Sequence, residues 1–131
     1  MGPLPWISLG DFNVVLNPCE VFGGNLGRDQ GAEDFNDCVN ASCLVDLRYT
    51  GCYFSWNNCR SDSELFIKKK LDRALVNRGW LDSFPTTFAK FLPSGISDHS
   101  PIVIHMTILV RKKGMAFNFL TIGLPWINFM I

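Results

Sequence analysis

The chain has 131 residues, which is enough for one domain and too few for two. Hydrophobic residues make up 47% and charged residues 18%, a balance too apolar for a disordered chain. Twelve basic residues offset twelve acidic ones, so no overall positive charge draws the chain to nucleic acid, and contact with DNA or RNA would need a local patch.

The first third of the chain predicts one strand and one helix. The apolar run at residues 6–9, closed by Gly10, is typical of a buried strand that ends in a turn. The glycine-rich stretch 17–31 predicts a surface loop. Across residues 32–43 the apolar residues recur at helical spacing and acidic residues lie near the start, so this segment predicts a helix.

The middle third predicts two strands, at residues 47–56 and 65–76, separated by the polar loop 57–64. Successive side chains of a strand point to opposite faces. In the second segment one face therefore carries Leu71, Arg73 and Leu75, and the other carries Asp72, Ala74 and Val76.

The last third adds a short helix and two strands. Asn77 is suited to cap a helix that carries Trp80 inward, and residues 86–92 and 102–106 predict strands. Helices and strands are mixed, strands are in the majority, and no internal repeat occurs. The fold class is therefore α/β or α+β with a sheet core.

The chain carries five cysteines, and their pattern bears on the compartment. Their number is odd, no pair has the CxxC spacing of a zinc site, and the N-terminus has no signal peptide. We expect reduced thiols in an intracellular protein, nuclear or cytoplasmic, with a disulfide as the less favoured alternative.

Residues 114–131 contain no charged side chain, and their number is close to the about 20 residues that a membrane-spanning helix needs. Two asparagines, a glycine and a proline within them disfavour a helix in lipid. We therefore favour a segment that leads to a following domain over a tail anchor, and we expect no membrane partner.

Three polar clusters lie at the ends of predicted strands, and the first is at residues 10–13. On an extended segment Asp11 and Asn13 would project from the same face. A carboxylate beside an amide can hold a water or a metal and contact a phosphate oxygen. An ordinary Asp/Asn turn is the alternative, and these four residues alone favour it.

The second and third clusters contain Asp72 and His99. A carboxylate on an apolar strand face needs a partner, and an Arg or Lys would serve. Histidine titrates near neutral pH and moves protons in phosphoryl or acyl transfer, with a carboxylate at its second nitrogen. Asp98 would point away from His99 on an extended strand, so Asp72 is the better candidate; alternatively, His99 is an ordinary surface histidine. The lysine run 68–70 predicts a solvated surface more than a DNA contact.

Taken in order, these clusters resemble the endonuclease/exonuclease/phosphatase superfamily. The three motifs that carry the resemblance are LGDFN at 9–13, KLDR at 70–73 and SDHSPI at 97–102. Two further stretches, GCYFSWNN at 51–58 and LVNRGW at 75–80, are most similar to the endonuclease domains of plant LINE-type non-LTR retrotransposons.

The resemblance implies a role for each matching residue. Asp11 matches the aspartate that activates the attacking water or protonates the leaving group, and Asn13 matches the asparagine that contacts the scissile phosphate. Asp72 matches the aspartate that pairs with the catalytic histidine, and His99 matches that histidine, which contacts the substrate phosphate.

The resemblance also implies a metal site and a further phosphate contact. Asp98 matches a metal-site carboxylate, with Asp11 and Asn13 near a second metal, and Ser55 is the nearest candidate for a hydroxyl that contacts the phosphate. The metal would be Mg²⁺, or Mn²⁺ in its place, and the partner of the intact domain would be DNA.

The matching region, residues 4–106, corresponds to the C-terminal half of a four-layer α/β sandwich in which helices flank a sheet core. The glutamate that is the principal Mg²⁺ ligand of the family has no counterpart here, so we expect weak metal binding and an inactive isolated chain. An exposed sheet face would await an N-terminal half or another chain. Residues 107–131 would be the remnant of a linker toward a lost reverse transcriptase. The alternatives are a non-catalytic interaction module and a tail-anchored protein.

Overall fold

The structure, a computed structural model, describes residues 2, 4–24, 30–110 and 118–123. Within these ranges the fold is mixed α and β, which confirms the predicted class. The elements in chain order are β1 (Ile7–Asp11), the 3-10 helix η1 (Pro18–Glu20), β2 (Val21–Phe22), α1 (Gln30–Ala41), β3 (Val45–Asp46), β4 (Tyr49–Gly51), β5 (Trp56–Asn57), β6 (Lys68–Lys69), β7 (Asp72–Val76), α2 (Arg78–Ser83), β8 (Phe88–Phe91), β9 (Ile102–Val110) and β10 (Asn118–Gly123).

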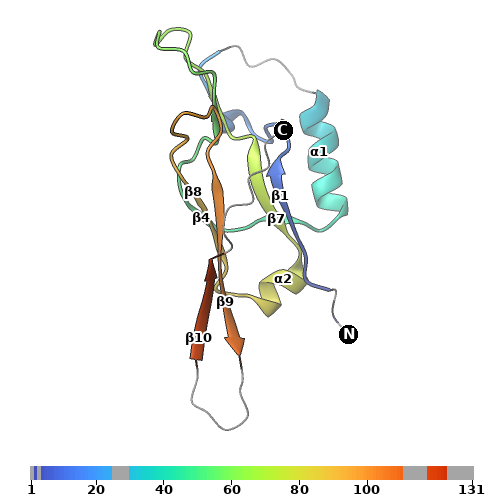
Figure 1. Ribbon diagram of the computed structural model, residues 1–131. Helices are drawn as coiled ribbons and strands as arrows, with labels where there is room; N and C mark the ends of the chain where they lie inside the picture. The colour runs from blue at the N-terminus through green and yellow to red at the C-terminus, as the bar shows by residue number, and fades with distance from the viewer. Residues whose placement is uncertain (1, 3, 25–29, 111–117, 124–131) are drawn as a thin grey trace.

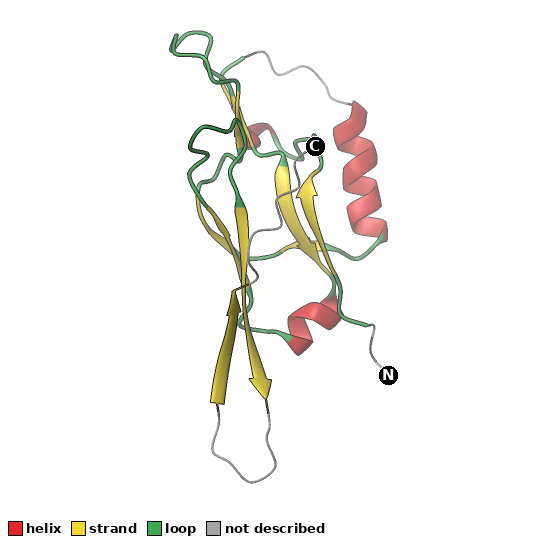
Figure 2. Ribbon diagram, in the orientation of Figure 1, coloured by secondary structure: helices red, strands yellow, loops and turns green. Residues whose placement is uncertain are grey.

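The described strands form three sheets, with orders β1-β7-β3, β10-β9-β8-β4 and β2-β6-β5. Strands β4 and β8 pair in parallel, and the other pairs are antiparallel. Figure 1 shows α1 running alongside β1 and β7, and Figure 2 shows how much of the upper part of the molecule is loop. The Phe12 and Phe35 rings, 5.0 Å apart, connect the end of β1 to α1.

The core lies between the first two sheets. Ala74 and Val76 of β7 pack with Ala89 and Phe91 of β8, and Leu47 completes the group. Strand β7 is buried along its whole length, because it is the central strand of its sheet. Its side chains therefore need partners on both faces, the polar ones included.

The two long strands predicted in the middle of the chain are each broken. Residues 47–56 form β4 and β5, and β4 ends at Gly51, where φ is 92° and a Cβ would lie 2.0 Å from the Phe91 carbonyl oxygen. Residues 65–76 form β6 and β7, which belong to different sheets. The chain thus changes sheets between Lys69 and Asp72, and this change positions the site described below.

The two predicted helices are present. Helix α1 begins and ends two residues before the predicted 32–43. Helix α2 is capped as expected, since the Asn77 side chain accepts a hydrogen bond of 3.0 Å from the Trp80 amide. The stretch 17–31 is not simply a surface loop, because it contains η1 and β2.

The last predicted strand, 102–106, is longer than expected, because β9 continues to Val110 and pairs with β10. The expected boundary between residues 106 and 107 thus falls inside a strand. Residues 118–123 of the apolar tail form β10, and the rest of 114–131 lies outside the described residues. In the described part of the chain no helix has the length and apolar character needed to cross a membrane.

All five cysteines are free, and no disulfide joins them. The Cys19 thiol lies 3.6 Å from the Tyr53 hydroxyl, and this contact raises the pKa of Tyr53 to about 12. Large apolar side chains reach the surface at several places, among them Phe22 and Ile96.

Candidate functional site

Strands β1 and β7 bring two carboxylates together. The two strands pair antiparallel, and their register places Asp11 directly opposite Asp72. The residue after Asp11 continues the pairing, since the Phe12 amide donates to the Leu71 carbonyl at 3.0 Å. Asp72 is buried by its position on the central strand, whereas Asp11 is exposed at the end of an edge strand.

His99 joins these carboxylates from a loop that precedes β9. An isolated antiparallel bridge between Trp56 and His99 holds the loop in place. The His99 ring then contacts both aspartates, with Nδ1 2.9 Å from Asp72 Oδ2 and Nε2 3.9 Å from Asp11 Oδ2. The predicted pairing of Asp72 with His99 is therefore confirmed, and the alternatives of an Arg or Lys partner and of a lone surface histidine are wrong.

The electrostatics of this cluster favour a charged imidazole. Burial lowers the pKa of His99, but the hydrogen bond to Asp72 and the charges of Asp72, Asp11 and Asp98 raise it more, so the net pKa is raised above its ordinary value. Since a carboxylate only accepts, the Nδ1–H donates to Asp72 and the Nε2 position faces Asp11. The ring can thus hold a proton at Nε2 and release it there.

Asn13 does not project beside Asp11 in the predicted way. Its φ is 53°, in the left-handed region, and its backbone amide donates to Asp11 Oδ1 at 2.7 Å. Asp11 thus closes an Asx-type turn, and asparagine tolerates the left-handed conformation at position 13 well. The turn reading was the right one, and its consequence is that one oxygen of Asp11 is already occupied by a backbone bond.

Asp98 lies beside the cluster without belonging to it. Its Oδ2 accepts a hydrogen bond of 3.1 Å from the Trp56 indole, and its carbonyl accepts one of 3.0 Å from the Asn57 amide. In the described residues, the group whose ligand atoms all lie within 4.8 Å of one another is Asp11, Asp72 and His99. The indole bond of Asp98 was not foreseen, although the tryptophan itself belongs to one of the resembling motifs.

Ser55 is not at the surface where a phosphate could reach it, because it is 1% exposed. Its Oγ accepts hydrogen bonds from the Leu71 amide at 3.0 Å and the Asp72 amide at 2.8 Å. The expected hydroxyl contact to substrate therefore has no support in this conformation, since the side chain is enclosed between the strands.

A buried ion network supports β7 on the face opposite Asp72. Arg73 is fully buried and contacts Glu20 and, at 2.8 Å, Asp46. Glu20 also accepts hydrogen bonds from the backbone amides at positions 16 and 17. Glu20 lies in the stretch that predicts a surface loop; the spacing of Asn17 and Glu20, typical of a capping box, is the signal that could have identified it.

The lysine run is not the solvated surface that the sequence predicts. Lys70 is buried, its Nζ lies 3.3 Å from Asp46 Oδ2, and it sits 4.5 Å from the centre of the Tyr49 ring. Lys68 and Lys69 are half-buried and lie over the rings of Phe66 and Trp56. Lys70 therefore has no free charge to offer a DNA phosphate.

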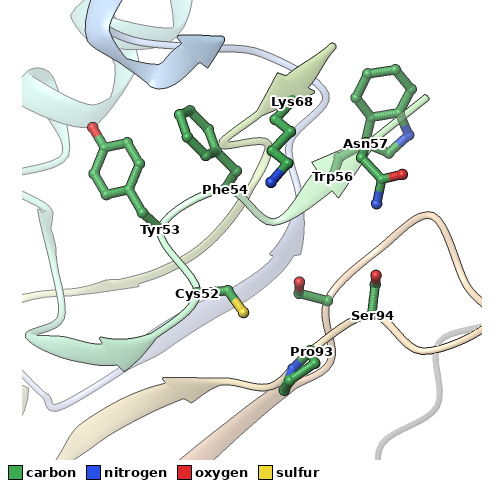
Figure 3. A pocket seen from close by; sticks show the side chains of 9 residues that line it. Cys52, Tyr53, Phe54, Trp56, Asn57, Lys68, Pro93 and Ser94 are labelled. Atoms are coloured by element: carbon green, nitrogen blue, oxygen red, sulfur yellow. The ribbon is translucent and has the colours of Figure 1, made fainter. Parts of the chain in front are cut away.

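A pocket of about 320 Å³ opens next to the cluster. Figure 3 shows Lys68 and Asn57 on one wall and Ser94 with Pro93 on the opposite wall. Its lining residues are Cys52, Tyr53, Phe54, Trp56, Asn57, Lys68, Pro93, Ser94 and Ser100. The members of the Asp11–Asp72–His99 cluster do not line it, so the pocket is a neighbour of the cluster rather than its cavity.

The ligand atoms of the cluster do not match the coordination that Mg²⁺, the metal implied by the resemblance, prefers. Mg²⁺ prefers near-octahedral coordination by oxygen. The cluster offers one nitrogen, one carboxylate engaged by His99 and one carboxylate, Asp11, that already accepts a backbone amide. These described residues do not by themselves make a Mg²⁺ site, whereas they suit acid–base chemistry.

Comparison of the chain with protein-family models, with curated proteins and with solved structures gave no match.

Proposed function

We propose that Asp11, Asp72 and His99 form the acid–base centre of a phosphodiester-hydrolysing site, derived from a DNA-nicking endonuclease of LINE type. The observation that carries the proposal is the two-sided contact of His99, with Asp72 at Nδ1 and Asp11 beyond Nε2. The three residues come from three separate segments and meet at the start of β7, where Asp72 is the first residue. Asp72 orients the ring, as a carboxylate does in an Asp–His pair.

The cluster accounts for two parts of such a reaction. The raised pKa keeps His99 cationic up to a higher pH than usual, and a cation beside the scissile group stabilises the charge of the phosphate. The 3.9 Å between Nε2 and Asp11 is too long for a direct hydrogen bond, so the carboxylate oxygen is free to accept a proton from water.

The composition of the cluster supports the expectation that the chain does not cleave DNA alone. Phosphodiester hydrolysis in such enzymes draws on a divalent metal, and the cluster does not supply the oxygen ligands for it. We therefore expect no nicking by the purified chain, even though its histidine recognises the phosphate.

The test monitors the two histidines of the chain, His99 and His105, by NMR while a short DNA duplex is added in the presence of Mg²⁺. We expect the ring signals of His99 to move with DNA concentration and those of His105 to stay in place. The isosteric variant Asp11→Asn serves as a comparison, since it retains the shape of the site and removes the charge that faces Nε2.

A His99 signal that does not respond to DNA would contradict the proposal. A supercoiled-plasmid assay with Mg²⁺ tests the expected inactivity separately. Nicking by the chain that His99→Ala abolishes would show that the described ligands suffice after all.

A further inference from the structure

We infer that Ser55 is a positioning residue that holds Asp72 and His99 in register with each other. The inference rests on the proposed function for its meaning and on hydrogen bonds for its geometry. Asp72 and His99 are 27 residues apart in the chain. Among the described strands no ladder joins β7 to the loop that carries His99, so another element must set their separation.

The hydroxyl of Ser55 fixes the position of Asp72. Its Oγ accepts hydrogen bonds from two consecutive backbone amides, those of Leu71 and Asp72. These amides lie where the chain leaves β6 and enters β7, between two sheets. The hydroxyl thus satisfies both amides at the break and sets where β7 begins.

The backbone of Ser55 fixes the position of the loop that carries His99. Its carbonyl accepts a hydrogen bond of 2.7 Å from the Ser100 amide, directly after His99. The next residue, Trp56, forms the bridge to His99 itself. One residue therefore holds Asp72 through its side chain and the histidine loop through its main chain.

The burial of Ser55 makes this connection rigid. Ser55 is 1% exposed, so water cannot reach the two amides and replace the hydroxyl as their acceptor. Removing it leaves two buried amides without their partner, and a buried amide without a partner is unfavourable. We expect the backbone at the start of β7 to shift so that these amides find other acceptors, and Asp72 shifts with it.

The test reads the tautomer of the neutral His99 ring by long-range ¹H–¹⁵N NMR correlation, in the absence of DNA. The bond to Asp72 selects the Nδ1–H form, whereas a free imidazole in water favours the Nε2–H form. We expect Ser55→Ala to convert His99 from mainly Nδ1–H to mainly Nε2–H, and Ser55→Thr, which keeps the hydroxyl, to retain the native form. His105 in the same spectrum is the internal reference.

Ser100→Ala is the matched control. It also removes a serine hydroxyl beside His99, one that lines the neighbouring pocket and makes no hydrogen bond to the described residues around Asp72. We expect its spectrum to show the native tautomer. Where Ser55→Ala does not fold, Ser55→Cys, which has similar volume and a weak acceptor, is compared with Ser55→Thr.

A folded Ser55→Ala or Ser55→Cys with an unchanged His99 tautomer would overturn the inference. The result does not depend on hydrolysis or on DNA. If His99 fails to respond to DNA while the tautomer still depends on Ser55, the proposed function falls and the positioning role stands.

Discussion

The buried ion pair between Glu20 and Arg73 allows a quantitative prediction. The side chains of this pair are 5% and 0% exposed. Glu20→Gln removes the charge of the carboxylate but keeps an oxygen that can accept the backbone amides. Breaking a buried pair from one side costs about 3–5 kcal/mol, because the remaining charge loses its partner. Arg73 keeps its contact with Asp46, so we expect the lower end, about 3 kcal/mol.

That loss is large against a total stability of about 5–15 kcal/mol for a domain of this kind. Urea unfolding followed by tryptophan fluorescence measures it. The matched control is Asp82→Asn in the exposed pair with Arg78, whose side chains are 59% and 78% exposed. Its loss should stay within about 0.5 kcal/mol.

A second variant separates the charge effect from a packing effect. Adding Arg73→Met to Glu20→Gln removes the stranded charge as well, so part of the stability should return. A loss of stability for Glu20→Gln no larger than that of Asp82→Asn would contradict a stabilising role for the buried ion pair. The pH dependence of unfolding gives a further measurement. Burial raises the pKa of Glu20, but Arg73 and backbone hydrogen bonds lower it more, to below its ordinary 4.5. The stabilisation that the ionised Glu20 provides is therefore present above about pH 4.5 and lost as pH falls through the folded-state pKa of Glu20.

Three further predictions concern substitutions at Asp72, Asn77 and Gly51. Asp72→Asn should lower the pKa of His99 toward 6.5 in an NMR titration, and an unchanged pKa would contradict the pairing. The stabilisation that the Asp72–His99 pair provides is full below pH 6.5 and is lost as pH rises through the folded-state pKa of His99. Asn77→Ala removes bonds to two backbone amides and one carbonyl and should cost about 2 kcal/mol or more in urea unfolding, whereas a loss below about 0.5 kcal/mol would be inconsistent with the cap. Gly51→Ala should cost about 3 kcal/mol or more, from positive φ and backbone overlap together, and clearly exceed Gly95→Ala, where φ is also positive but space is free.

Local patterns predicted much of the fold. The helix at 32–43 was visible as apolar spacing, and the cap at Asn77 as a residue type in the right place. Strand alternation also turned Asp98 away from His99, and this made Asp72 the better candidate for the carboxylate that His99 contacts. The helix and its cap depend on neighbours in sequence, which is why the sequence alone contains them, whereas the Asp72–His99 contact joins residues 27 apart and could only be offered as a candidate.

Features that depend on distant partners were not predictable in this way. Lys70 resembles a surface lysine until Asp46 and Tyr49 are brought against it. Ser55 is buried only because two segments close over it, and Glu20 only because Arg73 reaches it. In each case the sequence shows a polar residue, and its environment is made by a contact with a residue 16 or more positions away in the chain.

Asp72 and Arg73 are neighbours in the chain but serve opposite faces of β7, one toward His99 and the other toward Glu20. Because the side-chain period of a strand is two, inserting or deleting one residue at the start of β7 would turn the guanidinium toward the imidazole and the carboxylate toward another carboxylate. Both charge pairings would reverse together. This strand should accordingly reject any change of length, because each charge pairing depends on the alignment that the other one also requires.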